Sequence, residues 1–234
     1  MAAWKALLIV YRELDVRLPG RWRKQRFHHL ATREEVSDAT ESFRAFPRLA
    51  TELTADAIRI ESRVIEVDAV LRSLTEQDPG YFWPSPCDTR RQLDEFAPPG
   101  SCQSIFIFWP QSDPGKRSSI QCRGWGLGMG PSELSNGATY AVVANAPSWI
   151  WRREAPGEVW LHEWLHGVSQ IFAKQGHALP RLDADGAEIH GYVRSETAGW
   201  TDYYRDLMTG NVLEDGKRLG IPRDAWNIAW GKVG

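Results

Sequence analysis

Short apolar runs occur in the first two thirds of the chain and predict β-strands. Such runs occupy residues 6–11, 104–109 and 139–144, and the second of them stops at Pro110. Runs of this length, bounded by charged residues or by proline, are typical of buried strands. Residues 58–67 alternate first on one parity and then on the other, which predicts a single long strand with a bulge.

Other segments repeat with the period of a helix. Apolar side chains recur on one face of residues 33–53, and Pro47 is expected at a break or in a first turn of that helix. Residues 157–175 carry an apolar stripe at the spacing i, i+4, i+7 and i+11. The stripe consists of Leu161, Leu165, Val168 and Phe172. Both segments therefore predict amphipathic helices with one buried face.

Two further helices are expected towards the C-terminus. The first runs from about residue 196 to residue 208, and Gly210 would end it, since glycine readily adopts the left-handed conformation that closes a helix. The second is short and lies within residues 221–230, where it would place Trp226 and Trp230 on one side.

Together these elements predict an α+β fold with a mixed twisted sheet. A single domain is expected, rich in strands over residues 1–150 and mainly helical over residues 151–234. Residues 78–100 are dense in proline, glycine and aromatic side chains, so we expect an irregular segment that covers one face. The strand at 139–144 directly precedes the striped helix and is expected to present an open edge, to which an extended peptide could add as a further strand.

Composition narrows the class of partner. The chain has 234 residues, of which 42% are hydrophobic and 25% are charged, and its net charge is −2. The two signs are interspersed without a basic stripe, which argues against nucleic acid or an anionic membrane as the main partner. No stretch approaches transmembrane length, and the run at 6–11 is too short for the core of a signal peptide. A soluble protein is expected, with secretion after removal of a leader as an alternative.

Tryptophan and cysteine give weaker indications. The chain has 12 tryptophans, and we expect most of them in the core instead of in an aromatic binding groove. Cys87, Cys102 and Cys122 do not form a zinc-ligand set, and a bridge from Cys87 to Cys102 is one alternative. The glycine-rich stretch 123–130 lacks the setting of a phosphate-binding loop, so we interpret it as backbone that bends tightly or approaches a ligand closely.

One stretch carries residues of chemical interest at a meaningful spacing. His162 and His166 are four positions apart within the striped helix. Side chains at i and i+4 lie on one face of a helix, so both imidazoles could bind one metal ion. Glu163 is rotated around the helix, which suits a general base better than a third ligand. The alternative is a chance match in which ordinary hydrogen bonds satisfy both histidines.

A hydrolytic zinc site needs a third protein ligand. Five downstream residues are candidates: His177, Asp183, Asp185, Glu188 and His190. His177 lies about three turns further along the helix and would be too distant, whereas a loop after the helix lets the chain return to the histidines. Asp185 is the preferred third ligand, with Glu188 and His190 as alternates.

The motif His162-Glu163-Trp164-Leu165-His166 resembles the active-site helix of the zincin metallopeptidases. The resemblance implies Zn²⁺ held by the two histidines, Glu163 as the base that activates water, and a mixed sheet whose edge strand binds substrate. A tyrosine that stabilises an oxyanion opposite the metal would complete such a site. The candidates are Tyr192, Tyr203 and Tyr204, and the first and last are preferred.

The subfamily stays open. The metzincin pattern fails, because Ser169 and Phe172 stand where it has glycine and histidine. A gluzincin-like site would take Glu188 or Glu196 as third ligand, and an aspzincin-like site would take Asp185.

The resulting hypothesis is a zinc-dependent peptidase that hydrolyses a peptide or protein substrate through a metal-activated water. Two alternatives belong to other classes. In one, the metal only stabilises the fold of a tryptophan-rich binding module; in the other, a zinc hydrolase acts on non-peptide amides. The oligomeric state is left undetermined by the sequence.

Overall fold

The structure is a computed structural model that describes residues 2–19, 24–145 and 155–227. Within these residues, six strands form one mixed sheet in the order β2-β1-β6-β10-β9, with β3 also paired to β1. Their bounds are β1 Ala2–Leu18, β2 Gln25–Leu30, β3 Ile58–Leu71, β6 Ser104–Trp109, β9 Gly126–Met129 and β10 Thr139–Ala144. The strands β3, β1, β6 and β10 pair in parallel, whereas β2 and β9 pair antiparallel with their neighbours.

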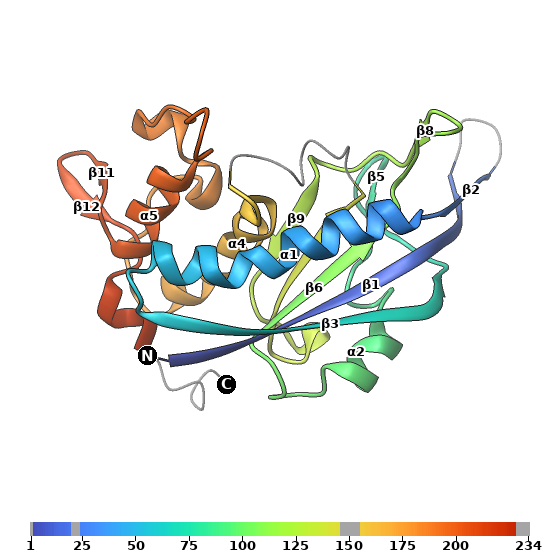
Figure 1. The fold of residues 1–234 in the computed structure, drawn as a ribbon, viewed down its shortest axis with the longest axis horizontal. Helices are drawn as coiled ribbons and strands as arrows, with labels where there is room; N and C mark the ends of the chain where they lie inside the picture. The colour runs from blue at the N-terminus through green and yellow to red at the C-terminus, as the bar shows by residue number, and fades with distance from the viewer. Residues whose placement is uncertain (1, 20–23, 146–154, 228–234) are drawn as a thin grey trace.

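Helices and small hairpins surround this sheet (Figure 1). The helices are α1 Arg33–Leu53, α2 Arg90–Phe96, α4 Glu158–Lys174 and α5 Thr201–Thr209. Four 3₁₀ turns are η1 Glu133–Ser135, η2 Asp183–Asp185, η3 Glu188–His190 and η4 Arg223–Asn227. The hairpins are β4 Thr75–Asp78 with β5 Tyr81–Trp83, β7 Ser112–Asp113 with β8 Ser118–Ser119, and β11 Val212–Glu214 with β12 Lys217–Leu219.

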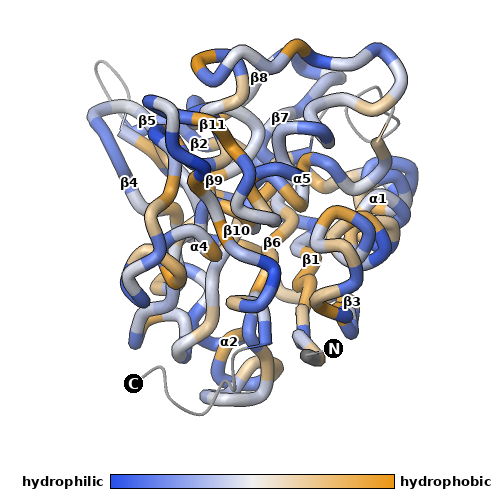
Figure 2. Tube along the Cα trace, turned by 90° about the vertical axis from the view of Figure 1, so that its left-hand side faces the viewer, coloured by the Kyte–Doolittle hydropathy of each residue, from blue (hydrophilic) through white to orange (hydrophobic). Residues whose placement is uncertain are grey.

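The sheet is covered on both faces. In β1, Leu8 and Val10 belong to the core beneath α1, α4 and α5, while Leu7 and Ile9 belong to a second core that includes Leu93 of α2. Successive side chains of a strand point to opposite faces, so a strand buried on both sides is apolar throughout. Figure 2 shows the hydrophobic positions concentrated in the middle of the molecule around β6 and β10.

The predicted α+β class and mixed sheet are confirmed. Segment 78–100 covers the second face, as expected, although it contains part of the β4–β5 hairpin and α2 instead of being wholly irregular. The two parities in β3 have a different cause from the one predicted: Ile58 and Ile60 face one core, and Val67 faces the other. The register shift in β3 lies beyond Val67.

Two other sequence predictions need correction, and a third lies outside the described residues. The helix α1 continues through Pro47, which lies inside it, because the buried Phe43 and Phe46 fix that turn against the core. The last long helix begins at Thr201, several residues later than predicted, and ends at Gly210 with φ 72° as expected. Trp230, predicted on a short C-terminal helix, lies outside the described residues.

The strand β10 is not the edge of the sheet. It lies between β6 and β9, and all six of its residues are buried. The edge strand on this side of the sheet is β9, from the glycine-rich stretch, so the prediction that 139–144 forms the edge is wrong. The short β9 was missed because glycine weakens the apolar alternation by which a strand is recognised.

Aromatic side chains form much of the core around α4. Trp4 of β1 lies against Trp164 with ring centroids 5.2 Å apart, and Trp226 of η4 stacks on Trp164 at 5.7 Å. The hydroxyl of Ser104 accepts hydrogen bonds from the indoles of Trp4 and Trp164. Five of the described tryptophans are almost fully buried, in agreement with the predicted core role. These five are Trp4, Trp109, Trp160, Trp164 and Trp226.

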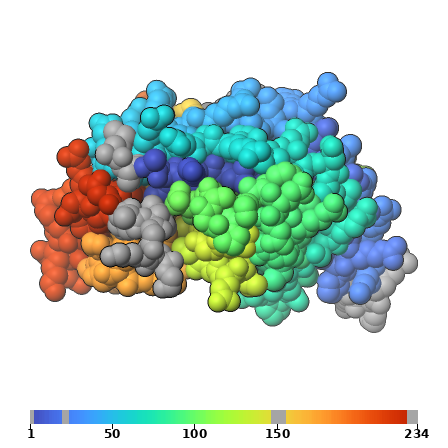
Figure 3. All heavy atoms as spheres, turned by 90° about the horizontal axis from the view of Figure 1, so that it is seen from below, coloured from blue at the N-terminus to red at the C-terminus, as the bar shows by residue number. Residues whose placement is uncertain are grey.

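The C-terminal part gathers at one end of the molecule, as the space-filling view shows (Figure 3).

Cys87, Cys102 and Cys122 are free thiols, so the bridge from Cys87 to Cys102 is absent from the structure. In the described part of the chain, no helix combines the length and the apolar character that crossing a membrane requires.

Candidate metal centre

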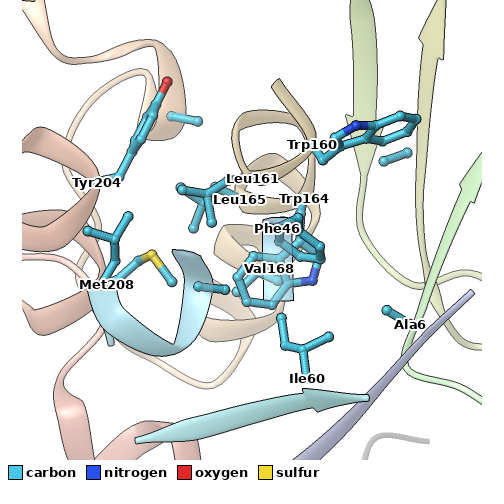
Figure 4. Close-up of a cluster of buried hydrophobic side chains, with 14 of the residues drawn as sticks. Ala6, Phe46, Ile60, Trp160, Leu161, Trp164, Leu165, Val168, Tyr204 and Met208 are labelled. Atoms are coloured by element: carbon cyan, nitrogen blue, oxygen red, sulfur yellow. The ribbon is translucent and has the colours of Figure 1, made fainter. Parts of the chain in front are cut away.

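The helix α4 presents two different faces. Leu161, Leu165 and Val168 point into the core shared with Phe46 and Met208 (Figure 4). The histidines lie on another face and are only partly buried, with side-chain exposures of 26% for His162 and 19% for His166. The buried stripe thus fixes the helix, and the fixed helix holds both imidazoles at the surface of a pocket.

Three side chains converge at this face. The Nε2 atoms of His162 and His166 are 3.3 Å apart. One carboxylate oxygen of Asp185 lies 3.3 Å from the Nε2 of His162, and the other lies 3.8 Å from the Nε2 of His166. Ligands at about 2.0–2.1 Å from a tetrahedral Zn²⁺ are about 3.3 Å from one another. The spacing of these donors therefore fits one small cation, and two imidazoles with a carboxylate are a donor set that zinc accepts.

The second nitrogen of each imidazole has its own partner. The Nδ1 of His162 lies 2.9 Å from the hydroxyl of Tyr204, and the Nδ1 of His166 lies 2.6 Å from a carboxylate oxygen of Asp183. An imidazole that binds a cation through Nε2 carries its proton on Nδ1 and donates it to such a partner. The Asp183 carboxylate can only accept, so it favours the tautomer of His166 whose Nε2 lone pair is free, while the Tyr204 hydroxyl is compatible with the same tautomer in His162.

Glu163 has the environment expected of a base. Its side chain lies in the pocket wall, yet the residue is only 6% exposed. Burial raises the pKa of its carboxyl, while the nearby His162 and His166 oppose that rise. A carboxylate whose pKa is moved towards neutrality is a better match for proton transfer near pH 7 than one with an ordinary pKa.

Asp185 and His166 also have shifted pKa values. The hydrogen bond with His162 lowers the pKa of Asp185 and outweighs its partial burial, which keeps the carboxylate ionised. For His166, burial lowers the pKa, but the hydrogen bond and charge of Asp183 outweigh it and the net shift is upward. The carboxylates thus give the cluster a negative electrostatic potential, as a cation site requires.

The edge strand β9 packs directly on α4 through glycines. A Cβ atom on Gly126 would lie 2.5 Å from the Cδ of Glu163, and one on Gly128 would overlap the backbone oxygen of Glu163. Gly126 and Gly128 are two residues apart and therefore share one face of the strand. The glycines let the edge backbone lie against the helix turn that bears Glu163. The stretch is predicted to bend tightly or to approach a ligand closely; in the structure Gly126 and Gly128 form a strand, and their close neighbour is the helix α4.

A pocket of about 590 Å³ opens between these elements. Residues 123–128, from the segment before β9 and from β9 itself, form one wall of the pocket, and α4 forms another. Its charged lining among the described residues comprises Arg123, Glu158, Glu163, Asp185 and Glu188. Trp200 and Tyr204 add aromatic surface. The candidate ligands and Glu163 thus border a cavity large enough for part of a peptide.

The structure does not bring the alternate ligands to the cluster. Glu188 lines the pocket but is not among the three residues whose donor atoms converge. The His190 Nε2 faces the backbone oxygen of Arg181 and the carboxylate of Glu214. His177 lies against Phe172 at the end of the helix.

The tyrosines also differ in their placement. Tyr204 reaches the site, but its hydroxyl contacts the imidazole of His162. Tyr192 donates to Asp206, 2.5 Å away, and is not part of the pocket lining. Tyr203 donates to the backbone oxygen of Asp183. It therefore supports the 3₁₀ turn Asp183–Asp185, the acidic turn, and does not face a substrate.

The acidic turn has an unusual backbone. Leu182 and Asp183 both have positive φ, 64° and 34°. Such conformations are costly for residues with a side chain and persist where the surroundings hold them. Here Tyr203 and His166 bind Asp183, and Glu214 accepts the backbone N–H of Arg181 at 2.9 Å. From the sequence, Asp183 is predicted only as a possible ligand, and its role as partner of His166 becomes visible only with the backbone of the turn.

Comparison of the chain with protein-family models, with curated proteins and with solved structures finds no match. The case for a function therefore depends on the site itself.

Proposed function

We propose that the protein is a zinc-dependent peptidase. The observation that carries the proposal is the convergence of His162, His166 and Asp185 beside the buried Glu163, at the edge of a sheet. A bound Zn²⁺ would supply the Lewis acid that polarises a carbonyl group and acidifies water. Every other part of the chemistry belongs to residues of this chain.

Glu163 takes a proton from the attacking water and delivers it to the amine that leaves. Its burial keeps the carboxylate away from bulk water and raises its pKa, so the same group can accept and then return the proton. His162 and His166 hold the metal, and Tyr204 and Asp183 fix the orientation of their rings.

The open edge of β9 supports a peptide as the substrate. The backbone N–H of Ala144 donates to the oxygen of Trp125 at 2.9 Å, which places Trp125 in a hydrogen-bonded pair with β10. Backbone groups alternate in direction along an antiparallel strand, so Gly126 and Gly128 turn theirs away from β10. No other described strand pairs with that side of β9. An extended peptide could hydrogen-bond there.

The test has two parts. Elemental mass spectrometry of protein purified without chelator should find about one zinc per chain, removable by a chelator and restored by added zinc. Glu163→Gln should retain the metal and lose at least about 100-fold in turnover of a peptide library, because it removes the general base. Glu95→Gln, an exposed carboxylate on α2 outside the pocket, is the matched control and should retain both.

Two results would contradict the proposal. One is protein that binds no zinc even after zinc is added, which would leave the two histidines as ordinary hydrogen-bonding groups. The other is a Glu163→Gln variant with unchanged peptide turnover. Cleavage of small amides without any cleavage of peptides would instead support the non-peptide hydrolase.

A further inference from the structure

The pocket contains an arginine held in a defined orientation. The Nε of Arg123 donates to Asp78 at 2.7 Å, and its guanidinium carbon lies 5.3 Å from the ring centroid of Tyr81. Both partners belong to the β4–β5 hairpin. A 2.8 Å hydrogen bond from the backbone N–H of Phe82 to the backbone oxygen of Gln121 joins this hairpin to the segment that precedes β9. One edge and one face of the guanidinium are therefore fixed.

The remaining edge of Arg123 is available. Among the described residues, its two terminal nitrogens have no hydrogen-bond partner. Those nitrogens form the fork that binds a carboxylate through two parallel hydrogen bonds. Since Asp78 and Tyr81 already restrict the side chain, less conformational entropy is lost when a ligand binds.

The charges in the pocket make this end distinct. Arg123 is the only cation among the described lining residues, whereas Glu158, Glu163, Asp185 and Glu188 are acidic. Away from the metal cluster, an anionic ligand group is thus repelled by these carboxylates and attracted at Arg123. The asymmetry would orient a peptide that carries one terminal carboxylate.

The direction of β9 indicates which end of the peptide reaches Arg123. Antiparallel pairs are the more common arrangement, and a peptide paired in this way runs opposite to β9. Gly126 lies directly beside the Glu163 carboxyl group, so the peptide bond to be cleaved would lie near Gly126. Arg123 precedes Gly126 by three residues, at most about 10 Å of extended chain. The C-terminal end of the peptide would therefore point to Arg123.

We propose that Arg123 binds the C-terminal carboxylate of the substrate, so that the enzyme releases short peptides of two or three residues from free C-termini. This inference rests on the proposed peptidase function and names its substrate class. Water is added across the peptide bond: the hydroxyl group goes to the acyl carbon, and its proton goes through Glu163 to the nitrogen of the leaving peptide.

The experiment compares peptides that differ only in the C-terminal group. Each peptide of a cleavable series is made as the free acid and as the C-terminal amide, and products are identified by mass spectrometry. The wild-type protein should show about a 10- to 100-fold higher kcat/KM for the acids, the range expected of charge-assisted hydrogen bonds. The released fragment should be the C-terminal di- or tripeptide.

Variants assign the preference to Arg123. Arg123→Gln should lower kcat/KM for the acids to the value for the amides, with unchanged zinc content. Arg91→Gln, an exposed arginine on α2, should keep the full preference. Asp78→Asn keeps the guanidinium but weakens its orientation, so it should lose part of the preference; this variant still tests the inference if Arg123→Gln does not fold.

The outcomes separate this inference from the function beneath it. Equal cleavage of acids and amides, or release of N-terminal fragments, would overturn the role of Arg123 and leave the peptidase standing. If the zinc-loaded wild-type protein cleaves neither form of any peptide, both proposals fail.

Discussion

The two sides of the metal centre are built in different ways. On one side, α4 brings His162, Glu163 and His166 on a regular helix whose opposite face is buried in the core and whose flank lies against β9. On the other side, Asp183 and Asp185 come from a 3₁₀ turn that begins with positive φ at Asp183 and at the preceding Leu182, and the side chain of Asp185 is 63% exposed. One side is fixed by packing, the other by a few hydrogen bonds.

This difference separates two kinds of mutational effect. A change where α4 meets β9 acts on the fold, because buried backbone atoms have no room to move. A change at Asp185 in the turn acts mainly on the metal, because that side chain is exposed and contributes little buried surface. The following variants test that distinction, beginning with the largest expected effect.

Gly128→Ala should damage the packed side most. Its Cβ atom would overlap the backbone oxygen of Glu163, so β9 or α4 must shift. Overpacking of this kind costs about 1–3 kcal/mol of unfolding free energy, and more where backbone is the obstacle. Denaturant unfolding followed by tryptophan fluorescence measures the loss. Gly115→Ala in the β7–β8 loop is the control, since its Cβ atom would meet only a side-chain oxygen at 3.3 Å. Equal stabilities of the two variants would contradict the close contact.

Asp185→Ala should remove a ligand while leaving the fold intact. We expect zinc affinity to fall by more than about 100-fold, beyond the range for residues that only support a ligand, with a thermal midpoint of the metal-free protein unchanged within about 2 °C. Competition with a chromophoric chelator measures the affinity. Glu188→Ala, which lies in the same pocket but outside the converging group, should keep its zinc. Full zinc occupancy in Asp185→Ala, together with loss of zinc in Glu188→Ala or His190→Ala, would show that Asp185 is not the third ligand.

Asp183→Asn should have the smallest effect of the three. The amide oxygen can still accept from the Nδ1–H of His166, but the negative charge that supports the imidazole is lost. Zinc affinity should decrease by about 10- to 100-fold, as for other partners of metal-bound histidines. Asp202→Asn, an exposed carboxylate on α5, should match the wild-type affinity. An Asp183→Asn variant that also binds like the wild type would show that the turn does not orient His166.

Sequence patterns predicted the packed side well and the turn poorly. The period of Leu161, Leu165 and Val168 places a helix without further information, and the helix fixes the relation of His162 to His166. Asp185 could only be ranked first among neighbours, because a 3₁₀ turn has no long repeat. The partnership of Asp183 with His166 depends on a left-handed backbone at the preceding Leu182, a residue with no preference for that conformation.

The edge strand shows a second limit. Gly126 and Gly128 alternate with Leu127 and Met129, which is the period of a strand, but glycine is a poor strand former. Its presence has a reason only once α4 is known to lie against it. The same holds for Arg123: its sequence neighbours do not reveal Asp78 or Tyr81, which come from a hairpin more than 40 residues earlier. Contacts distant in sequence determine both features.

The packing of Trp164 against both Trp4 and Trp226 has a consequence for biosynthesis. Trp164 lies between His162 and His166 in sequence, whereas its two partners lie near opposite ends of the described chain. A ribosome releases the N-terminal part first, so β1 and α4 emerge from the exit tunnel before η4 has been made. During that interval Trp164 of α4 lacks its aromatic neighbour Trp226. The metal centre of a nascent chain therefore gains its full support only after residue 226 has been synthesised and released.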